Sequence, residues 1–193
     1  MRRCTAAEAA ALVRPEDTLA LPLAPGQPLD FLDALGRRDD WKGLTVFTGL
    51  LAAPFELFLK PGVRLVSCAF GPVERGRRDA GQRVDFIPGD FRRFGRIARR
   101  LAPRVVATAA APPDKDGWMS LSLHAGATVE EIARCGRDPE RLLVVEASRR
   151  LPRTLGLGQD RHAIHVDEVD VLVESGRDPP TLPAAPPTAT DRA

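Results

Sequence analysis

Four consecutive apolar residues occur at Leu142-Leu143-Val144-Val145, with no polar residue among them. A strand with one side in water alternates apolar and polar residues, whereas a run that is apolar throughout predicts a strand buried on both faces. Strands of that kind are typical of parallel sheets with helices packed on both sides. A run of small residues from Val105 to Ala111 predicts another such strand.

Strands and helices alternate along the chain on either side of these two runs. Thr5 is followed three residues later by Glu8, the pattern of a capping box that begins a helix. Further strands are expected at 18–21, 44–47, 64–68, 84–87, 119–123 and 169–173, and helices at 5–13, 29–36, 91–101 and 128–135. The polar stretch 70–81 predicts a loop or a broken helix. The fold class is therefore α/β, with a mostly parallel sheet and helices on both faces.

The domain organisation follows from a change of composition near Ser175. Prolines are frequent in 178–187, and proline removes a hydrogen-bond donor and fixes φ, so this stretch forms neither a helix nor a central strand. We predict one domain at 1–175 and an extended proline-rich linker at 176–193. A linker of this kind separates two folded units, so it points toward a second domain that is absent from this sequence.

Charge and composition limit the classes of function. The formal net charge is only +2, which gives no general attraction to nucleic acid or to an anionic membrane. No apolar run reaches the roughly 20 residues that span a bilayer, and the start of the chain lacks the pattern of a signal peptide. The sequence predicts a cytoplasmic protein. Cys4, Cys68 and Cys135 form neither a disulfide framework nor a zinc pattern, and the last two are expected to be buried.

Ligands of parallel sheets bind at the carboxyl ends of the strands, which singles out the loops 22–28, 48–51, 112–118 and 148–158. The most distinctive of them joins the small residues of 109–111 to Pro112-Pro113-Asp114 and Gly117. Small side chains permit close approach of a ligand, and prolines preorganise a loop. The alternative, which the residues alone favour, is a rigid hairpin-like connection in which aspartates bond nearby amides.

Two other groups of polar residues have a structural and a functional interpretation. Acidic residues surround His162 and His165, but strand-like alternation divides such side chains between two faces, so we predict no metal site and a structural or pocket-lining His165. Arg153 follows a buried strand and either grips a carboxylate or lies on the surface. The arginines at 92, 93, 96, 99 and 100 are interpreted as the solvated face of an amphipathic helix rather than a nucleic-acid contact.

Seven short motifs occur in a fixed order along the chain. They are Thr5-Ala6-Ala7-Glu8-Ala9-Ala10 with the strand before Gly26, Leu44-Thr45-Val46-Phe47-Thr48-Gly49, Phe70-Gly71-Pro72, Val84-Asp85-Phe86-Ile87-Pro88, Pro112-Pro113-Asp114 with Gly117 and Ser120-Leu121, Pro152-Arg153-Thr154-Leu155-Gly156, and Ile164-His165-Val166 with Glu168-Val169-Asp170. In this order they resemble the acetyl-CoA hydrolase/transferase family, which includes acetate and 4-hydroxybutyrate CoA-transferases, over about residues 5–193.

The resemblance implies a NagB/RpiA/CoA-transferase type of domain and one half of an enzyme built from two related α/β halves. Acyl-CoA and a small carboxylate meet in the cleft between the halves, where a glutamate attacks the thioester and forms an anhydride and then a glutamyl-CoA thioester. That glutamate and the glycine-rich CoA loop belong to the second half, so no catalytic residue is assigned here, Glu146 included. Activity is expected only with a C-terminal half, supplied by the same gene or by a separate chain. The expected partner is that half or, alternatively, further copies of the chain in a homo-oligomer. No cofactor is implied, since coenzyme A is the acyl-carrier substrate.

The resemblance also implies which residues form one wall of the cleft. The substrate-binding candidates are Gly26, Gln27, Pro112, Pro113, Asp114, Gly117, Arg153 and His165. The chain departs from the family at Asp116, where a histidine is common, and at Ser122, where a glycine is common. A different class of function stays open: a non-catalytic remnant that binds a ligand or a partner protein. A sugar-phosphate isomerase on a related fold would need a glycine-rich phosphate loop that the sequence lacks.

Overall fold

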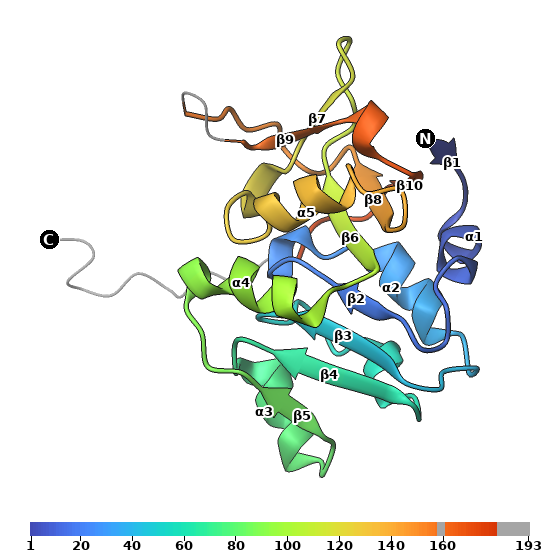
Figure 1. Cartoon of the computed structure of the whole chain (residues 1–193), viewed down its shortest axis with the longest axis vertical. Coiled ribbons are helices and arrows are strands. Elements are labelled where there is room, and N and C mark those ends of the chain that lie inside the picture. The colour runs from blue at the N-terminus through green and yellow to red at the C-terminus, as the bar shows by residue number, and fades with distance from the viewer. Residues whose placement is uncertain (158–160, 181–193) are drawn as a thin grey trace, which may run out of the picture.

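The computed structural model describes residues 1–157 and 161–180 (Figure 1). The strands of its main sheet are β1 (Arg2–Arg3), β2 (Thr18–Ala20), β3 (Leu44–Thr48), β4 (Val63–Ser67), β5 (Val84–Phe86), β6 (Val105–Ala110), β8 (Leu142–Ser148) and β10 (Val171–Ser175). Their order is β1-β10-β8-β6-β2-β3-β4-β5, and every neighbouring pair is parallel. A separate antiparallel ribbon pairs β7 (Trp118–Ser120) with β9 (Ala163–His165). The predicted fold class is confirmed.

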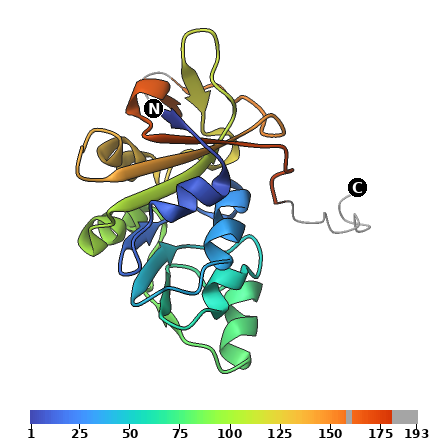
Figure 2. The ribbon, with the colours of Figure 1, turned by 90° about the vertical axis from the view of Figure 1, so that its right-hand side faces the viewer.

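Helices cover both faces of the sheet. The helices are α1 (Ala6–Ala11), α2 (Leu29–Gly36), α3 (Pro72–Asp79), α4 (Phe91–Leu101) and α5 (Val129–Cys135). The core on one face packs the strands against α1 and α2, and the core on the other packs them against α4, α5 and the β7–β9 ribbon. Figure 2 shows these two sets of helices on opposite sides of the twisted sheet.

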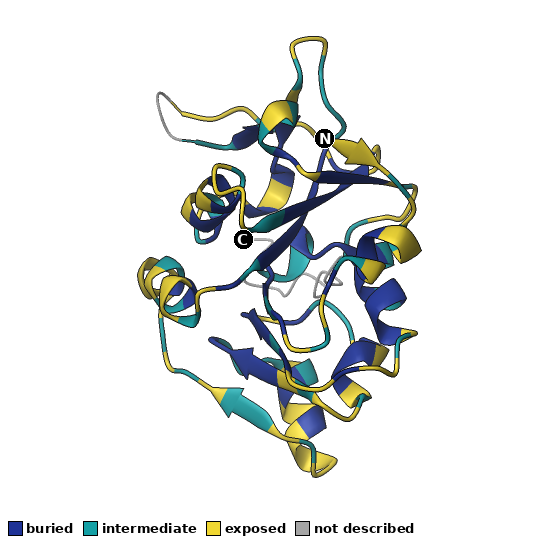
Figure 3. Ribbon diagram, turned by 45° about the vertical axis from the view of Figure 1, so that its right-hand side comes forward, coloured by how far each residue is buried: buried dark blue, intermediate teal, exposed yellow. Residues whose placement is uncertain are grey.

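Burial on both faces explains the apolar run that the sequence shows in β8. Val144 faces the core beneath α1 and α2, while Leu143 and Val145 face the core beneath α5, and all three are fully buried. β8 lies between β10 and β6, so neither of its edges meets water. Figure 3 shows the central strands as the most continuously buried part of the ribbon.

The predicted elements are found close to their expected bounds, with two informative differences. The capping box of α1 is present, because Thr5 Oγ1 accepts from the Glu8 amide at 3.2 Å and Glu8 Oε2 accepts from the Thr5 amide at 2.8 Å. The stretch 70–81 contains α3, an unbroken helix that begins at Pro72. The strand expected at 119–123 ends at Ser120, because Ser122 takes a left-handed φ of 58° and begins a turn.

The direction of the chain across the sheet reverses once. After β2 the chain adds β3, β4 and β5 on one side, and it then returns to place β6, β8 and β10 on the other side. β2 and β6 are neighbouring strands, and the chain continues from them toward opposite sides of the sheet. Crevices at such switch points are where open α/β sheets bind ligands.

The start of the predicted linker contacts the domain. Residues 176–180 form no helix or strand, and the guanidinium of Arg177 pairs with Asp33 and lies 3.3 Å from Asp30 Oδ1, both on α2. Residues 181–193 lie outside the described part of the chain, so the linker and the domain beyond it stay predictions. No helix in 1–157 or 161–180 is both long and apolar enough to cross a membrane.

Candidate functional site at the carboxyl edge of the sheet

The loop after β2 is anchored by the buried side chain of Gln27. Its Nε2 donates to Thr48 Oγ1 at 3.1 Å and to the Pro22 carbonyl at 3.2 Å, and its Oε1 accepts from the Ala52 amide at 2.8 Å. The side chain is 1% exposed. Gln27 therefore fixes the loops after β2 and β3 to each other, and its role in any site is to position them.

A buried carboxylate supports the loop after β3. Glu74 is fully buried, and it accepts from the Leu51 amide at 2.9 Å and from the Gly71 amide at 3.1 Å. Between these contacts Leu50 has φ of 53°, a region that costs a residue with a β-carbon about 1–2 kcal/mol. The contacts of Gln27 and Glu74 hold this strained backbone in place.

Gly26 lies against a buried histidine. A β-carbon at Gly26 would stand 2.3 Å from His124 Cγ, so only glycine fits. His124 belongs to the turn 122–124, and its Nε2 lies 2.9 Å from the carbonyl oxygen of Ala109 on β6. Burial lowers the pKa of His124, which keeps the ring neutral. The glycine thus permits the loops after β2 and β6 to meet at the switch point.

Unsatisfied polar atoms gather on the same turn. His124 Nδ1 and Ser122 Oγ are buried and have no hydrogen-bond partner among the described residues. Ser122 also carries the left-handed φ of 58°. Glycine takes this φ without strain, so a serine at this position costs free energy.

The loop after β6 is a rigid hairpin held by Asp114 and Arg153. Asp114 Oδ1 accepts from the Trp118 amide at 2.8 Å and from the Asp116 amide at 3.0 Å, and Arg153 Nη2 lies 2.7 Å from Asp114 Oδ2. The Trp118 amide, more than any other group, lowers the pKa of Asp114. Arg153 also donates to the Pro112 carbonyl at 3.2 Å. The carboxylate that Arg153 grips is thus one of the protein's own.

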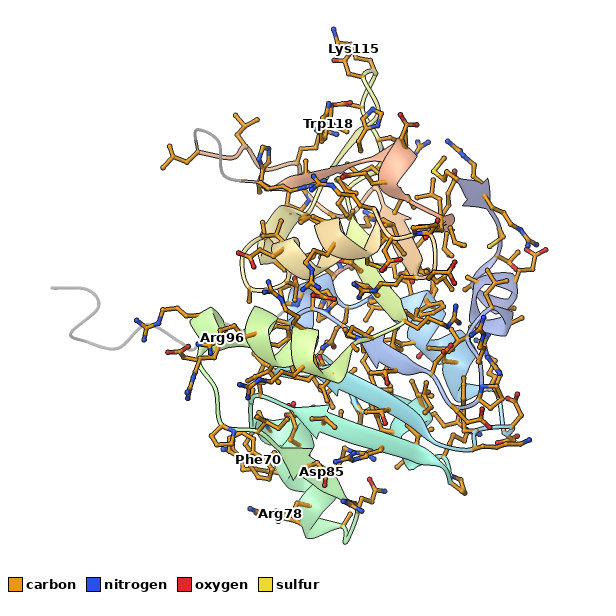
Figure 4. All side chains as sticks on the ribbon, viewed as in Figure 1. Phe70, Arg78, Asp85, Arg96, Lys115 and Trp118 are labelled. Carbon is orange, nitrogen blue, oxygen red and sulfur yellow. The ribbon has the colours of Figure 1, made fainter. Side chains whose placement is uncertain are left out.

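His165 closes the base of this hairpin. Its Nε2 lies 3.0 Å from the Asp116 carbonyl oxygen, and its ring meets Trp118 edge to face with centroids 5.1 Å apart. Gly117 has φ of 84°, and a β-carbon there would lie 2.7 Å from His165 Nε2. Figure 4 shows Trp118 at the base of the hairpin and Lys115 at its tip. Within the described residues no group of three or more His, Cys, Asp or Glu side chains is arranged to hold a metal ion.

Six of the predicted site residues divide among three cavities along one edge. Asp114, Arg153 and His165 line an open cavity of about 880 Å³ beside the hairpin. Gln27 lines a narrow crevice near the switch point, with Glu146 on its floor and residues 177–180 along its side. Pro112 and Pro113 line a third cavity, of about 590 Å³, beside the ends of β8 and β10.

Glu146 is a titratable residue within the buried strand β8. It is 3% exposed, and burial raises its pKa to about 7. Glu146 Oε2 accepts from the Phe31 amide at 2.9 Å in the first turn of α2. The burial of Glu146 can be expected from the sequence, because the residue directly follows Val144-Val145 in a strand that is buried on both faces. Its hydrogen-bond partner cannot, because Phe31 on α2 is distant in sequence.

Comparison with known proteins shows what the chain as a whole is similar to. No family model matches the chain. It is 30% identical over 194 residues to the succinyl-CoA:cyclohexane-1-carboxylate CoA transferase of Geobacter metallireducens, covering 98% of this chain and 42% of that protein. It is 25% identical to the 4-hydroxybutyrate coenzyme A transferase of Clostridium kluyveri, covering 97% of this chain and 42% of that protein. The chain thus spans less than half the length of these curated relatives.

Solved structures give the same picture of the fold. The crystal structure of RipA from Yersinia pestis superposes with a TM-score of 0.80 at 23% identity, over 97% of this chain and 45% of that one. A 4-hydroxybutyrate CoA-transferase from Porphyromonas gingivalis superposes with a TM-score of 0.66 at 20% identity, over 95% and 42%. At these identities the likeness establishes the fold.

The strain at Ser122 generates the first prediction. Glycine at this position relieves the left-handed backbone, whereas alanine keeps the strain, and both remove the unpaired hydroxyl. We expect Ser122→Gly to be more stable than Ser122→Ala by about 1 kcal/mol in urea unfolding followed by circular dichroism. A Ser122→Ala variant as stable as Ser122→Gly would show that the backbone there is not strained.

The raised pKa of Glu146 generates the second prediction. The unfolded carboxyl ionises near pH 4.5 and the folded one near pH 7, so the wild-type protein loses stability as pH rises through this window. The loss amounts to at most about 3 kcal/mol. Glu146→Gln keeps the acceptor for the Phe31 amide and carries no charge, so its free energy of unfolding should lack this component. Parallel stability profiles of the two proteins across this window would contradict the assignment.

Proposed function

The chain is similar to CoA-transferases over almost its whole length and corresponds to their N-terminal half, and from this premise we propose that it forms one wall of an acyl-CoA and carboxylate cleft. The observation that carries the proposal is the meeting of the loops after β2 and β6 at the switch point of the sheet, built from motifs shared with that family. The proposed reaction is transfer of the CoA group from an acyl-CoA to a carboxylate, or hydrolysis of the thioester by water. The catalytic glutamate is expected on a C-terminal half.

The stiffness of the edge supports a role as a preorganised wall. Gln27 and Glu74 fix the loops after β2 and β3 through buried hydrogen bonds, and Asp114 with Arg153 fixes the loop after β6. Gln27 and Glu74 are buried, and Asp114 pairs with Arg153 at the surface of the hairpin. A binding surface whose loops are fixed before the ligand arrives loses less entropy on binding.

The surroundings of Glu146 support the proposal that this half of the cleft carries no nucleophilic glutamate. A nucleophilic glutamate must be ionised and must reach the thioester carbon. Glu146 is buried, it accepts from the Phe31 amide, and its pKa of about 7 leaves it largely protonated in mildly acidic solution. The side chain is therefore a structural acid that joins β8 to the first turn of α2.

Exposed apolar side chains support a partner at the same edge. Several exposed large apolar residues of the described chain stand at or after the carboxyl ends of main-sheet strands: Phe86 ends β5, and Leu50, Phe91, Leu155 and Leu157 lie in the segments after β3, β5 and β8. Trp118 begins β7, Leu123 lies in the turn after it, and Met1 and Leu59 are exposed elsewhere. Exposed large apolar side chains suit a surface that another protein covers. We take the partner to be a C-terminal CoA-transferase half, from the same gene or from a separate chain.

Thioester turnover tests the function. The purified chain with acetyl-CoA, with and without succinate, should leave acetyl-CoA unchanged in a chromatographic assay, because the nucleophile is not on this half. Addition of the C-terminal half of a relative should convert acetyl-CoA to succinyl-CoA and acetate, or to free CoA and acetate. Turnover by the chain alone would contradict the proposal and would direct mutagenesis to Glu146 and Glu168. No turnover in either case would favour the alternative, a non-catalytic ligand- or partner-binding module.

Docking of the second half tests the apolar edge. Phe91 is 71% exposed near the carboxyl end of β5, and Leu59 is 56% exposed in the turn before β4. We expect Phe91→Asp to weaken association with a C-terminal half by about tenfold or more in sedimentation experiments. The matched variant Leu59→Asp should bind like the wild type. Equal weakening by both variants would mean that the carboxyl edge is not the docking surface.

A further inference from the structure

A cavity of about 590 Å³ lies at the carboxyl ends of β8 and β10, and we call it the β8–β10 cavity. Pro112 and Pro113 of the hairpin loop form one side of it, and Arg149 and Arg150, directly after β8, form another. Ala147 and Leu172 supply a buried apolar floor. β8 and β10 are neighbours in the sheet, with β1 at its edge (Figure 1).

Positive charge exceeds negative charge around this cavity. Arg3 Nη1 lies 2.9 Å from Glu174 Oε1, so these two lining groups balance each other. Arg150 Nε is 3.6 Å from Asp178 Oδ1, a weaker pairing. Arg149 has no hydrogen bond or ion pair from its side chain within the described residues. One guanidinium is thus uncompensated and a second is only loosely paired.

The turn that presents the two arginines is held by the fold. The Arg150 amide donates to Ser148 Oγ at 3.1 Å, and the same hydroxyl donates to the Arg177 carbonyl at 2.9 Å. The Leu151 amide donates to the Ser148 carbonyl at 3.2 Å, which closes the turn. The backbone of both arginines is therefore fixed at the end of a central strand, while their guanidinium groups stay available.

These features suit phosphate better than a lone carboxylate. Guanidinium groups match phosphate oxygens with parallel hydrogen bonds, and two neighbouring guanidiniums match a ligand that carries more than one negative charge. The volume is in the range of sites for ligands much larger than acetate. We propose that the β8–β10 cavity binds the phosphate groups of an elongated ligand through Arg149 and Arg150. Resting on the proposed function, that ligand is the acyl-carrier coenzyme A.

Other arginines of the molecule fit this role less well. Arg153 and Arg161 beside the hairpin are already paired with Asp114 and Glu168. Among the arginines of α4, Arg99 lines a smaller cavity and lies 3.8 Å from Glu130, and Arg96 points outward (Figure 4). Arg96 has no ion pair in the described residues, so it offers a matched control for a change of charge.

Calorimetric titration of the purified chain with coenzyme A and with inorganic pyrophosphate tests the proposal. Both should bind, and pyrophosphate should compete with coenzyme A, because the cavity recognises the phosphate groups. Arg149→Glu and Arg150→Glu should each weaken both ligands by about tenfold or more. Arg96→Glu makes the same change of charge and should leave both affinities unchanged. Acetate at equal concentration should not compete.

The outcomes separate this inference from the proposed function. Equal weakening by Arg96→Glu and Arg149→Glu, or no binding by the wild-type chain, would overturn the phosphate site. A second test uses the enzyme completed with a C-terminal half. If Arg149→Glu leaves the KM for acetyl-CoA unchanged in that enzyme, the phosphate site is overturned. Turnover by the wild-type protein in the same assay would still support the proposed function. Pyrophosphate binding that Arg149→Glu abolishes, together with absent wild-type turnover, would retain the site and reject the function.

Discussion

Burial of β6 and β8 on both faces is the constraint on which the rest of the structure depends. Each strand must be covered by helices on two sides, so the chain has to cross over the sheet repeatedly, and every strand of the main sheet runs in the same direction. Parallel strands place all their carboxyl ends at one edge. The loops that carry polar and strained residues are therefore gathered there by the same packing that stabilises the core.

Buried polar groups then determine the shape of that edge. Gln27 and Glu74 make hydrogen bonds in places where an unpaired group would cost about 1–3 kcal/mol, so their loops have few alternatives to the observed path. Leu50 and Ser122 keep left-handed backbone conformations within the same edge. Strain that the surroundings impose in this way gathers at sites where loop position matters more than local stability. The unsatisfied atoms of the turn 122–124 belong to the same pattern.

The chain presents an edge that is rigid, partly apolar and partly cationic, and it spans less than half of its CoA-transferase relatives. Rigidity suits a wall against which reactants are held, exposed apolar residues suit a covering partner, and Arg149 with Arg150 suits a phosphate-bearing ligand. The buried acid Glu146 contributes to none of these surfaces. It joins β8 to α2 and lines the same narrow crevice as residues 177–180.

The sequence by itself determined the α/β class, most element bounds, the loops at the carboxyl edge and the likeness to CoA-transferases. Those features depend on apolar periodicity, caps and local motifs, which act over a few residues. Tertiary structure alone decided that Gly26 lies on His124, that Arg153 grips Asp114 and that Glu146 meets the first turn of α2. It also decided that the side chain of Arg149 has no ion pair among the residues that the structure describes. The two-residue β1 likewise carries no pattern, because its pairing with β10 depends on a strand about 170 residues away. Contacts between distant segments depend on how whole elements pack, and no local spacing encodes that packing.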